Sequence, residues 1–93
     1  MSERIFKYKL EAGADVIMPA GAAILTVQTQ HGEICVWATV NPDAPKIKRR
    51  FWIYGTGHEM FDKPERSFYV GTVQLSGGAL VFHVFTDRVE YPL

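Results

Sequence analysis

The chain has 93 residues, with 10 lysines and arginines against 10 aspartates and glutamates, so its formal net charge at pH 7 is zero. Apolar residues make up 47% of the sequence and aromatic residues 13%, which is enough for a packed core and excludes a disordered or low-complexity protein. This length predicts one domain, residues 1–93, and the balanced charge argues against a strongly electrostatic binder of nucleic acids or membranes.

Apolar and polar residues alternate along most of the chain, in short runs rich in β-branched and aromatic residues. The pattern predicts seven strands: Arg4–Leu10, Asp15–Met18, Ala23–Gln30, Glu33–Val40, Arg49–Tyr54, Phe68–Leu75 and Ala79–Asp87. We therefore predict an all-β fold, a compact sandwich or partly closed barrel of about seven mainly antiparallel strands. A helix at residues 60–66 would end after its first turn, because Pro64 interrupts it.

The first hairpin turns at His31–Gly32, and a two-residue turn there fixes its register. Its pairs are Gln30 with Glu33, Val27 with Val36, Leu25 with Ala38 and Ala23 with Val40. Paired residues share a face, so the expected core face comprises Ala23, Leu25, Val27, Thr29, Ile34, Val36, Ala38 and Val40. Trp37 falls on the opposite, half-polar face together with Cys35. If that face is solvated, Trp37 needs a cover such as a loop, a ligand or a second subunit; the alternative is that the sheet curls and buries both faces.

The second hairpin turns at Ser76–Gly78. A loop of two or four residues keeps the faces consistent, whereas a loop of three mixes them. Its predicted pairs are Leu75 with Leu80, Val73 with Phe82, Gly71 with Val84, Gln74 with Val81, Thr72 with His83 and Val70 with Phe85. Gly71 in mid-strand indicates a bulge or the close approach of another segment.

The single cysteine, Cys35, excludes an internal disulfide and fits a reducing compartment. No apolar run reaches the roughly 18 residues that a membrane helix needs, and the first residues do not resemble a signal peptide. We therefore expect a cytoplasmic protein with no membrane partner.

The three histidines, His31, His58 and His83, lie far apart, and none stands at a metal-ligand spacing from another histidine or from Cys35. For His83 the simplest interpretation is a hydrogen bond to Thr72 across the strand ladder. Cys35 has no neighbour in sequence that would activate its thiol. We therefore predict no metal ion, no cofactor and no cysteine nucleophile.

Carboxylates gather in one segment, but cations are interleaved with them. Glu59, Asp62 and Glu65 alternate with Lys63 and Arg66, a pattern typical of a solvated loop. General acid–base catalysis needs two carboxyl groups in contrasting environments, so we predict no catalytic residues. An enzyme that uses His58 and one of these carboxylates as acid and base is kept as a minor alternative.

The segment Tyr54, Gly55, Thr56, Gly57 and His58 resembles a phosphate-binding loop, but it lacks the Gly-Lys-Ser/Thr ending and no clear helix follows. Two glycines nevertheless expose backbone N–H groups that can hold an anion. Binding of a small anionic ligand such as a nucleotide is therefore the alternative function. The plain structural interpretation of this segment is an ordinary turn after a strand.

A basic cluster leads directly into an aromatic run: Lys46, Lys48, Arg49 and Arg50 precede Phe51, Trp52, Ile53 and Tyr54. Such a cluster can bind nucleic acid by neutralising phosphates and stacking bases. It can also bind a protein, because arginine, tryptophan and tyrosine are enriched in binding hot spots. The plain structural interpretation is an edge strand whose charges prevent aggregation. Between the two functions, we favour the protein partner over nucleic acid.

Several segments together resemble a family of small uncharacterised bacteriophage and prophage proteins. They are Phe6–Leu10, Met18–Ala22, Val36–Ala38, Ile53–His58 and Gly78–Phe85, so the resemblance covers nearly the whole chain. It brings no catalytic or binding residues, and it implies a phage-encoded protein at work in the bacterial cytoplasm. By analogy with small accessory phage proteins, some of which block host defence, it favours binding over catalysis.

The sequence therefore predicts a non-enzymatic binding protein that engages a host or phage protein through Trp37, Trp52, Tyr54 and the basic segment 46–50. A homodimer is a second possible partner, because a second copy would cover an outward tryptophan and enlarge a small core.

Overall fold

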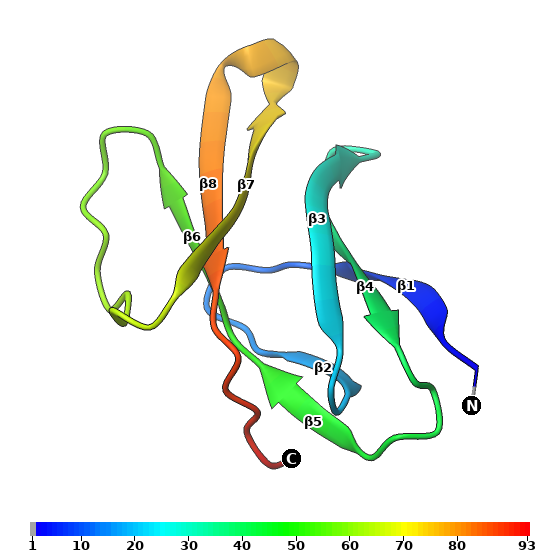
Figure 1. Ribbon diagram of the computed structural model, residues 1–93. Helices are drawn as coiled ribbons and strands as arrows, with labels where there is room; N and C mark the ends of the chain where they lie inside the picture. The colour runs from blue at the N-terminus through cyan, green and yellow to red at the C-terminus, as the bar shows by residue number, and fades with distance from the viewer. Residues whose placement is uncertain (1) are drawn as a thin grey trace.

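A computed structural model describes residues 2–93 (Figure 1). Within these residues the chain forms eight strands and one turn of 3-10 helix. They are β1 (Arg4–Lys9), β2 (Val16–Pro19), β3 (Ala23–Gln30), β4 (Glu33–Val40), β5 (Lys46–Arg49), β6 (Phe51–Gly55), β7 (Phe68–Leu75), η1 (Ser76–Gly78) and β8 (Leu80–Thr86). Within the described residues this single turn is the one helical segment, and it is far too short to cross a membrane.

The strands pair in three small antiparallel sheets, ordered β1-β4-β3, β2-β5 and β6-β8-β7. Figure 1 shows the two three-stranded sheets side by side, with β3 next to β7, and the β2-β5 pair beneath them near the C-terminus. No sheet closes on itself among the described residues, so the arrangement is sandwich-like rather than a barrel. The predicted all-β fold is confirmed.

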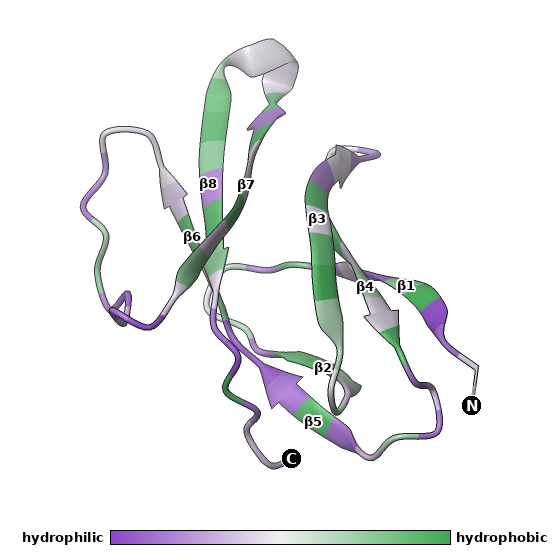
Figure 2. Cartoon of the chain, viewed as in Figure 1, coloured by the Kyte–Doolittle hydropathy of each residue, from purple (hydrophilic) through white to green (hydrophobic). Residues whose placement is uncertain are grey.

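All three sheets contribute to one core. Its buried side chains are Leu10, Val16, Met18, Ala22, Val27, Val36, Ala38, Val40, Val73 and Val84. Figure 2 shows the apolar residues along β3 and β8, whereas β5 is mostly hydrophilic. Because neither three-stranded sheet is large enough to bury its own apolar face, the sheets stabilise one another through this shared core.

The first hairpin has the predicted register near its turn. Gln30 pairs with Glu33 and Val27 with Val36, and His31 and Gly32 both adopt positive φ as a primed turn requires. A bulge between Ile24 and Thr26 then shifts the ladder, so the predicted pairs of Leu25 with Ala38 and Ala23 with Val40 are wrong. The extra residue inverts the faces beyond it, and Leu25 is 52% exposed.

The second hairpin also follows the prediction until a bulge. The pairs from Leu75–Leu80 to Gly71–Val84 are as expected, and the loop has four residues. Beyond Gly71 the register shifts, so Phe85 pairs with Tyr69 and not with Val70. Tyr69 thereby shares the outer face of the sheet with Phe85.

Gly71 marks both the bulge and a close approach. A Cβ atom on this residue would lie only 2.7 Å from Cγ1 of Val27 in β3. Glycine therefore lets β3 and β7 meet without a clash, and this contact joins the two three-stranded sheets.

The predicted strand Arg49–Tyr54 is in fact divided between two sheets. β5 ends at Arg49 and pairs with β2, whereas β6 begins at Phe51 and pairs with β8. Strand structure also begins earlier than expected, because Lys46–Arg49 forms β5 and not a loop. The chain changes sheets at Arg50, so the number of strands rises from seven to eight.

Candidate binding surface

The outer face of the β6-β8-β7 sheet carries two rows of cross-strand neighbours. In the first row Phe85 lies between Trp52 and Tyr69, and in the second His83 lies between Tyr54 and Thr72. Paired residues of an antiparallel sheet share a face. The face opposite the core is therefore largely aromatic.

The loop from Thr56 to Ser67 lies beside this face and is tied to it. The Tyr54 hydroxyl donates to the Phe61 carbonyl oxygen at 2.5 Å, and the backbone N–H of His58 donates to the Gly55 carbonyl at 3.1 Å. Burial raises the pKa of Tyr54, and the nearby Asp62 carboxylate adds to this rise. Met60 and Phe61 project from the loop, 45% and 68% exposed.

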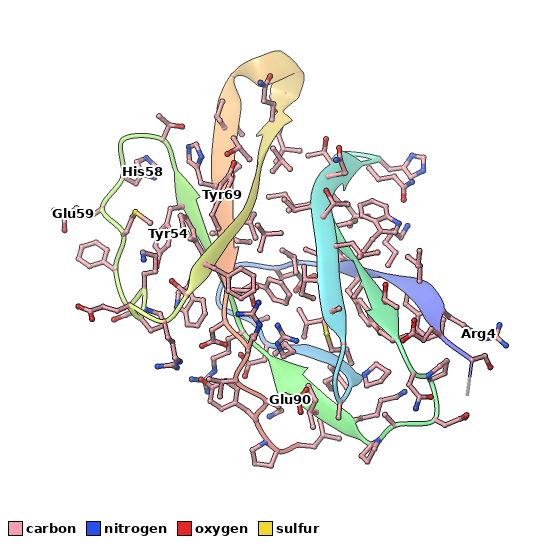
Figure 3. The ribbon with its side chains drawn as sticks, in the orientation of Figure 1. Arg4, Tyr54, His58, Glu59, Tyr69 and Glu90 are labelled. Atoms are coloured by element: carbon pink, nitrogen blue, oxygen red, sulfur yellow. The ribbon has the colours of Figure 1, made fainter. Side chains whose placement is uncertain are left out.

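A cavity of about 210 Å³ lies between the loop and the sheet. Its lining comprises Tyr54, Gly55, Thr56, Gly57, His58, Met60, Tyr69, His83 and Phe85. Figure 3 shows Tyr54, His58 and Tyr69 on this side of the molecule, while Arg4 lies at the far end of the other sheet. The segment 54–58, which the sequence singled out, is thus one wall of a real cavity.

Gly55 shapes that wall. A Cβ atom here would lie 2.8 Å from Nδ1 of His58. The imidazole ring therefore packs directly against backbone, which is possible only because residue 55 has no side chain.

Three aromatic rings of the cavity are mutually inclined. The Tyr54 and Phe85 centroids are 6.2 Å apart at an interplanar angle of 60°, and those of Tyr69 and Phe85 are 5.7 Å apart at 63°. Both pairs have the edge-to-face arrangement that aromatic quadrupoles favour. The ammonium of Lys63 lies 5.3 Å from the Phe85 centroid, within range of a cation–π contact.

His83 is held by hydroxyl groups at both ring nitrogens. Nδ1 is 2.9 Å from Oγ1 of Thr72, and Nε2 is 2.7 Å from Oγ1 of Thr56. Thr72 also shares a 2.5 Å hydrogen bond with the Tyr69 hydroxyl. The predicted bond between His83 and Thr72 is confirmed. The network fixes the ring and engages both nitrogens, so we assign His83 a structural role in the cavity.

A second, more polar cavity of about 390 Å³ adjoins the first. Arg50, Trp52, Tyr54 and Phe61 are among its lining residues. Tyr54 lines both cavities, and we call their combined lining the aromatic surface.

The four residues of the basic cluster do not form one exposed patch. The prediction that Arg49 contacts a partner is wrong, because this residue is buried. Its side chain is only 3% exposed. Nη1 donates to the Ala22 carbonyl at 3.0 Å, and Nη2 to the Asp87 carbonyl at 2.6 Å. Desolvation lowers the pKa of this guanidinium, and nearby carboxylates only partly oppose the effect. Arg49 therefore joins β5 to the segments around it and cannot contact a partner.

The other basic residues differ from one another. Lys46 is exposed, and the backbone of Lys48 pairs with that of Tyr91. Arg50 forms a 3.2 Å salt bridge with Asp15, and its guanidinium lies 4.0 Å from the Tyr91 ring centroid. Of the four, only Arg50 lines the aromatic surface.

Trp37 lies on the other three-stranded sheet, away from Trp52 and Tyr54. Its cross-strand neighbours are Lys7 in β1 and Thr26 in β3, and its ring is half-buried. Cys35, on the same face, is buried, so this face is more covered than its half-polar sequence suggests. The structure thus separates Trp37 from the rest of the predicted site.

Four large apolar residues of the aromatic surface were not singled out from the sequence as binding residues: Met60, Phe61, Tyr69 and Phe85. Tyr69 reaches the surface only because the bulge inverts its face, and Gly71 was the one available signal of that bulge. No cluster of three or more potential metal ligands occurs within residues 2–93.

Comparison with known proteins gives a family and no closer relative. Searches of curated proteins and of solved structures found no match to the chain. Residues 1–92 match the model of a domain of unknown function, DUF7352, and because the match spans nearly the whole chain, the protein belongs to the DUF7352 family.

Proposed function

We propose that the protein is a non-enzymatic binding protein of bacteriophage or prophage origin, which engages a host or phage protein in the bacterial cytoplasm. The aromatic surface is the contact region. The observation that carries the proposal is the exposure of three large side chains around it. Met60 is 45% exposed, Phe61 68% and Tyr69 57%.

The composition of this surface supports a protein partner. Methionine, phenylalanine, tyrosine and arginine are enriched in the cores of protein interfaces. Exposed apolar side chains grouped around cavities cost solvation free energy that a docked partner would recover. The cavities add concave shape, which lets a partner's side chain anchor there.

Two features favour binding over catalysis. Both ring nitrogens of His83 are hydrogen-bonded to threonine hydroxyls, so within the described residues this imidazole has no carboxylate partner of the kind that completes a catalytic triad. Glu59, one of the carboxylates in the loop, points away from the cavity that His58 lines (Figure 3). These two features support binding over acid–base catalysis at the cavity.

The geometry gives little support to a small anionic ligand. Among residues 2–93, no lysine or arginine lines the cavity beside residues 54–58. Arg49 is buried, and Arg50 is paired with Asp15. An anion at this cavity would therefore lack a strong cationic contact.

The experiment is capture of partners from a bacterial host extract by the immobilised protein. Phe61→Ala is the test variant, because it removes an exposed ring whose side chain forms no hydrogen bond. Ile17→Ala is the matched control, because Ile17 is 54% exposed on β2 and lies outside both cavities. We expect a specific partner to be retained by the wild type and the control and to be lost by Phe61→Ala. Equal retention by all three proteins would contradict the proposal.

A further inference from the structure

Building on the proposed protein-binding function, we propose that the cavity walled by Tyr54, Tyr69 and Phe85 receives a cationic side chain of the partner, an arginine or a lysine. The cavity would hold the guanidinium or ammonium group by cation–π contacts. The partner is therefore expected to present a basic segment.

The shape of the cavity suits one side chain. Tyr54, Tyr69 and Phe85 all line the same cavity, and the rings of Tyr54 and Tyr69 are inclined by 60° and 63° to Phe85, so they do not form a flat stack. The face of each ring carries the negative part of its quadrupole. The volume of about 210 Å³ is below the roughly 300–1,000 Å³ of typical small-molecule sites. A single long side chain fits this space better than a nucleotide does.

The chain already places a cation on one of these rings. The Lys63 ammonium lies 5.3 Å from the Phe85 centroid and is held by a 3.3 Å hydrogen bond to Oγ of Ser67. Lys63 is not part of the cavity lining. It therefore shows that the Phe85 ring accepts a cation, and an incoming cation that contacts the same ring would compete with Lys63 for it.

The charges around the cavity match a cationic guest. In the part of the chain that the structure describes, no lysine or arginine belongs to its lining. The neighbouring loop carries three carboxylates, Glu59, Asp62 and Glu65, and none of them forms an ion pair within the described part of the chain. Arg66, the loop's other cation, is bound to Asp87 at 3.0 Å. The local field thus favours a positive group over a negative one.

The hydrogen-bond network keeps the site in shape before a guest arrives. Thr56, Thr72 and His83 connect the loop, β7 and β8, and Thr72 also holds the Tyr69 hydroxyl. The ring of Tyr69 is therefore fixed at the cavity wall. A preorganised wall loses little conformational entropy when a partner binds.

The test is a titration with N-acetyl-arginine amide, followed by amide NMR shifts of residues 55–57. The neutral citrulline analogue serves as the matched ligand, because it keeps the shape and removes the charge. We expect saturable shifts with the arginine compound only. Equal shifts with both compounds, or no shifts with either, would overturn the cation site.

Two lysine variants sharpen the test. Lys63→Met removes the competing ammonium and is expected to tighten arginine binding about two- to five-fold, the range of an exposed cation–π contact. Lys46→Met, an exposed lysine on β5, is the control and should leave the affinity unchanged. Unchanged affinity in Lys63→Met would contradict the role of the Phe85 ring.

The two proposals fail separately. A partner that requires Phe61 but is not displaced by the arginine compound would overturn the cation site and leave the protein-binding function intact. Arginine binding without any captured partner would overturn the protein-binding function and leave the cation site intact.

Discussion

Replacing Gly71 with alanine tests the contact that joins the two three-stranded sheets. The added Cβ atom would lie 2.7 Å from Cγ1 of Val27, which is buried in the core. Carbon atoms are in optimal contact at about 3.5–4.0 Å, so β3 and β7 must separate by about 1 Å or adopt strained side-chain rotamers. Overpacking of this kind costs about 1–3 kcal/mol.

The assay is equilibrium unfolding in urea, followed by tryptophan fluorescence. Val27→Ala alone is expected to destabilise the protein by about 2–3 kcal/mol, because it removes two buried methyl groups and leaves a cavity. In the double variant Gly71→Ala/Val27→Ala the new methyl group partly fills the space. Its loss of unfolding free energy should therefore be smaller than the sum of the two single losses by at least about 1 kcal/mol. Additive losses, or a Gly71→Ala protein as stable as the wild type, would refute the close approach.

Three further predictions concern single residues. Arg49→Met is expected to destabilise the protein by about 2–4 kcal/mol in urea unfolding, since it removes a donor from two buried carbonyl groups, of which only that of Asp87 keeps another donor, the Thr86 hydroxyl. Gly55→Ala should cost less than about 1 kcal/mol, because the exposed His58 ring can move aside, but it should shift the NMR signals of the cavity. The pKa values of Tyr54 and Tyr8 are raised above 10.0 in the folded protein, so their stabilisation is present below pH 10 and is lost as the pH rises further. Alkaline unfolding curves of Tyr54→Phe should therefore depend less on pH than those of the wild type.

The turns made both hairpin registers predictable, and the bulges limited how far the prediction held. From each turn the alternation of side chains gave the correct pairs as far as Val27 and Gly71. Beyond these points one extra residue inverts the faces. A bulge depends on contacts between strands, such as that of Gly71 with Val27, and the alternation of the chain carries little trace of it.

The candidate site was partly visible in the sequence. The segment 54–58 stood out through its glycines, and it forms a cavity wall. Phe85 and Tyr69 complete the cavity and lie 27 and 11 residues after the end of the segment, so only the folded sheet brings them together. Arg49 and Arg50 are adjacent arginines that no sequence pattern distinguishes, yet Arg49 is buried and Arg50 is exposed. The change of sheet between β5 and β6 decides this difference.

The contact at Gly71 also bears on which strands can unfold locally. Of the contacts between the two three-stranded sheets, the most extensive runs along β3 and β7. Each sheet is therefore joined to the other along one edge strand, and its opposite edge strand is free of this contact. Local opening then begins at the free margins, which are β1 and β6 (Figure 1). Tyr54 and Thr56 at the β6 margin are hydrogen-bonded to the loop and to His83, whereas β1 is exposed along almost its whole length. We therefore expect β1 to open first, while β6 keeps the side chains of the aromatic surface in place.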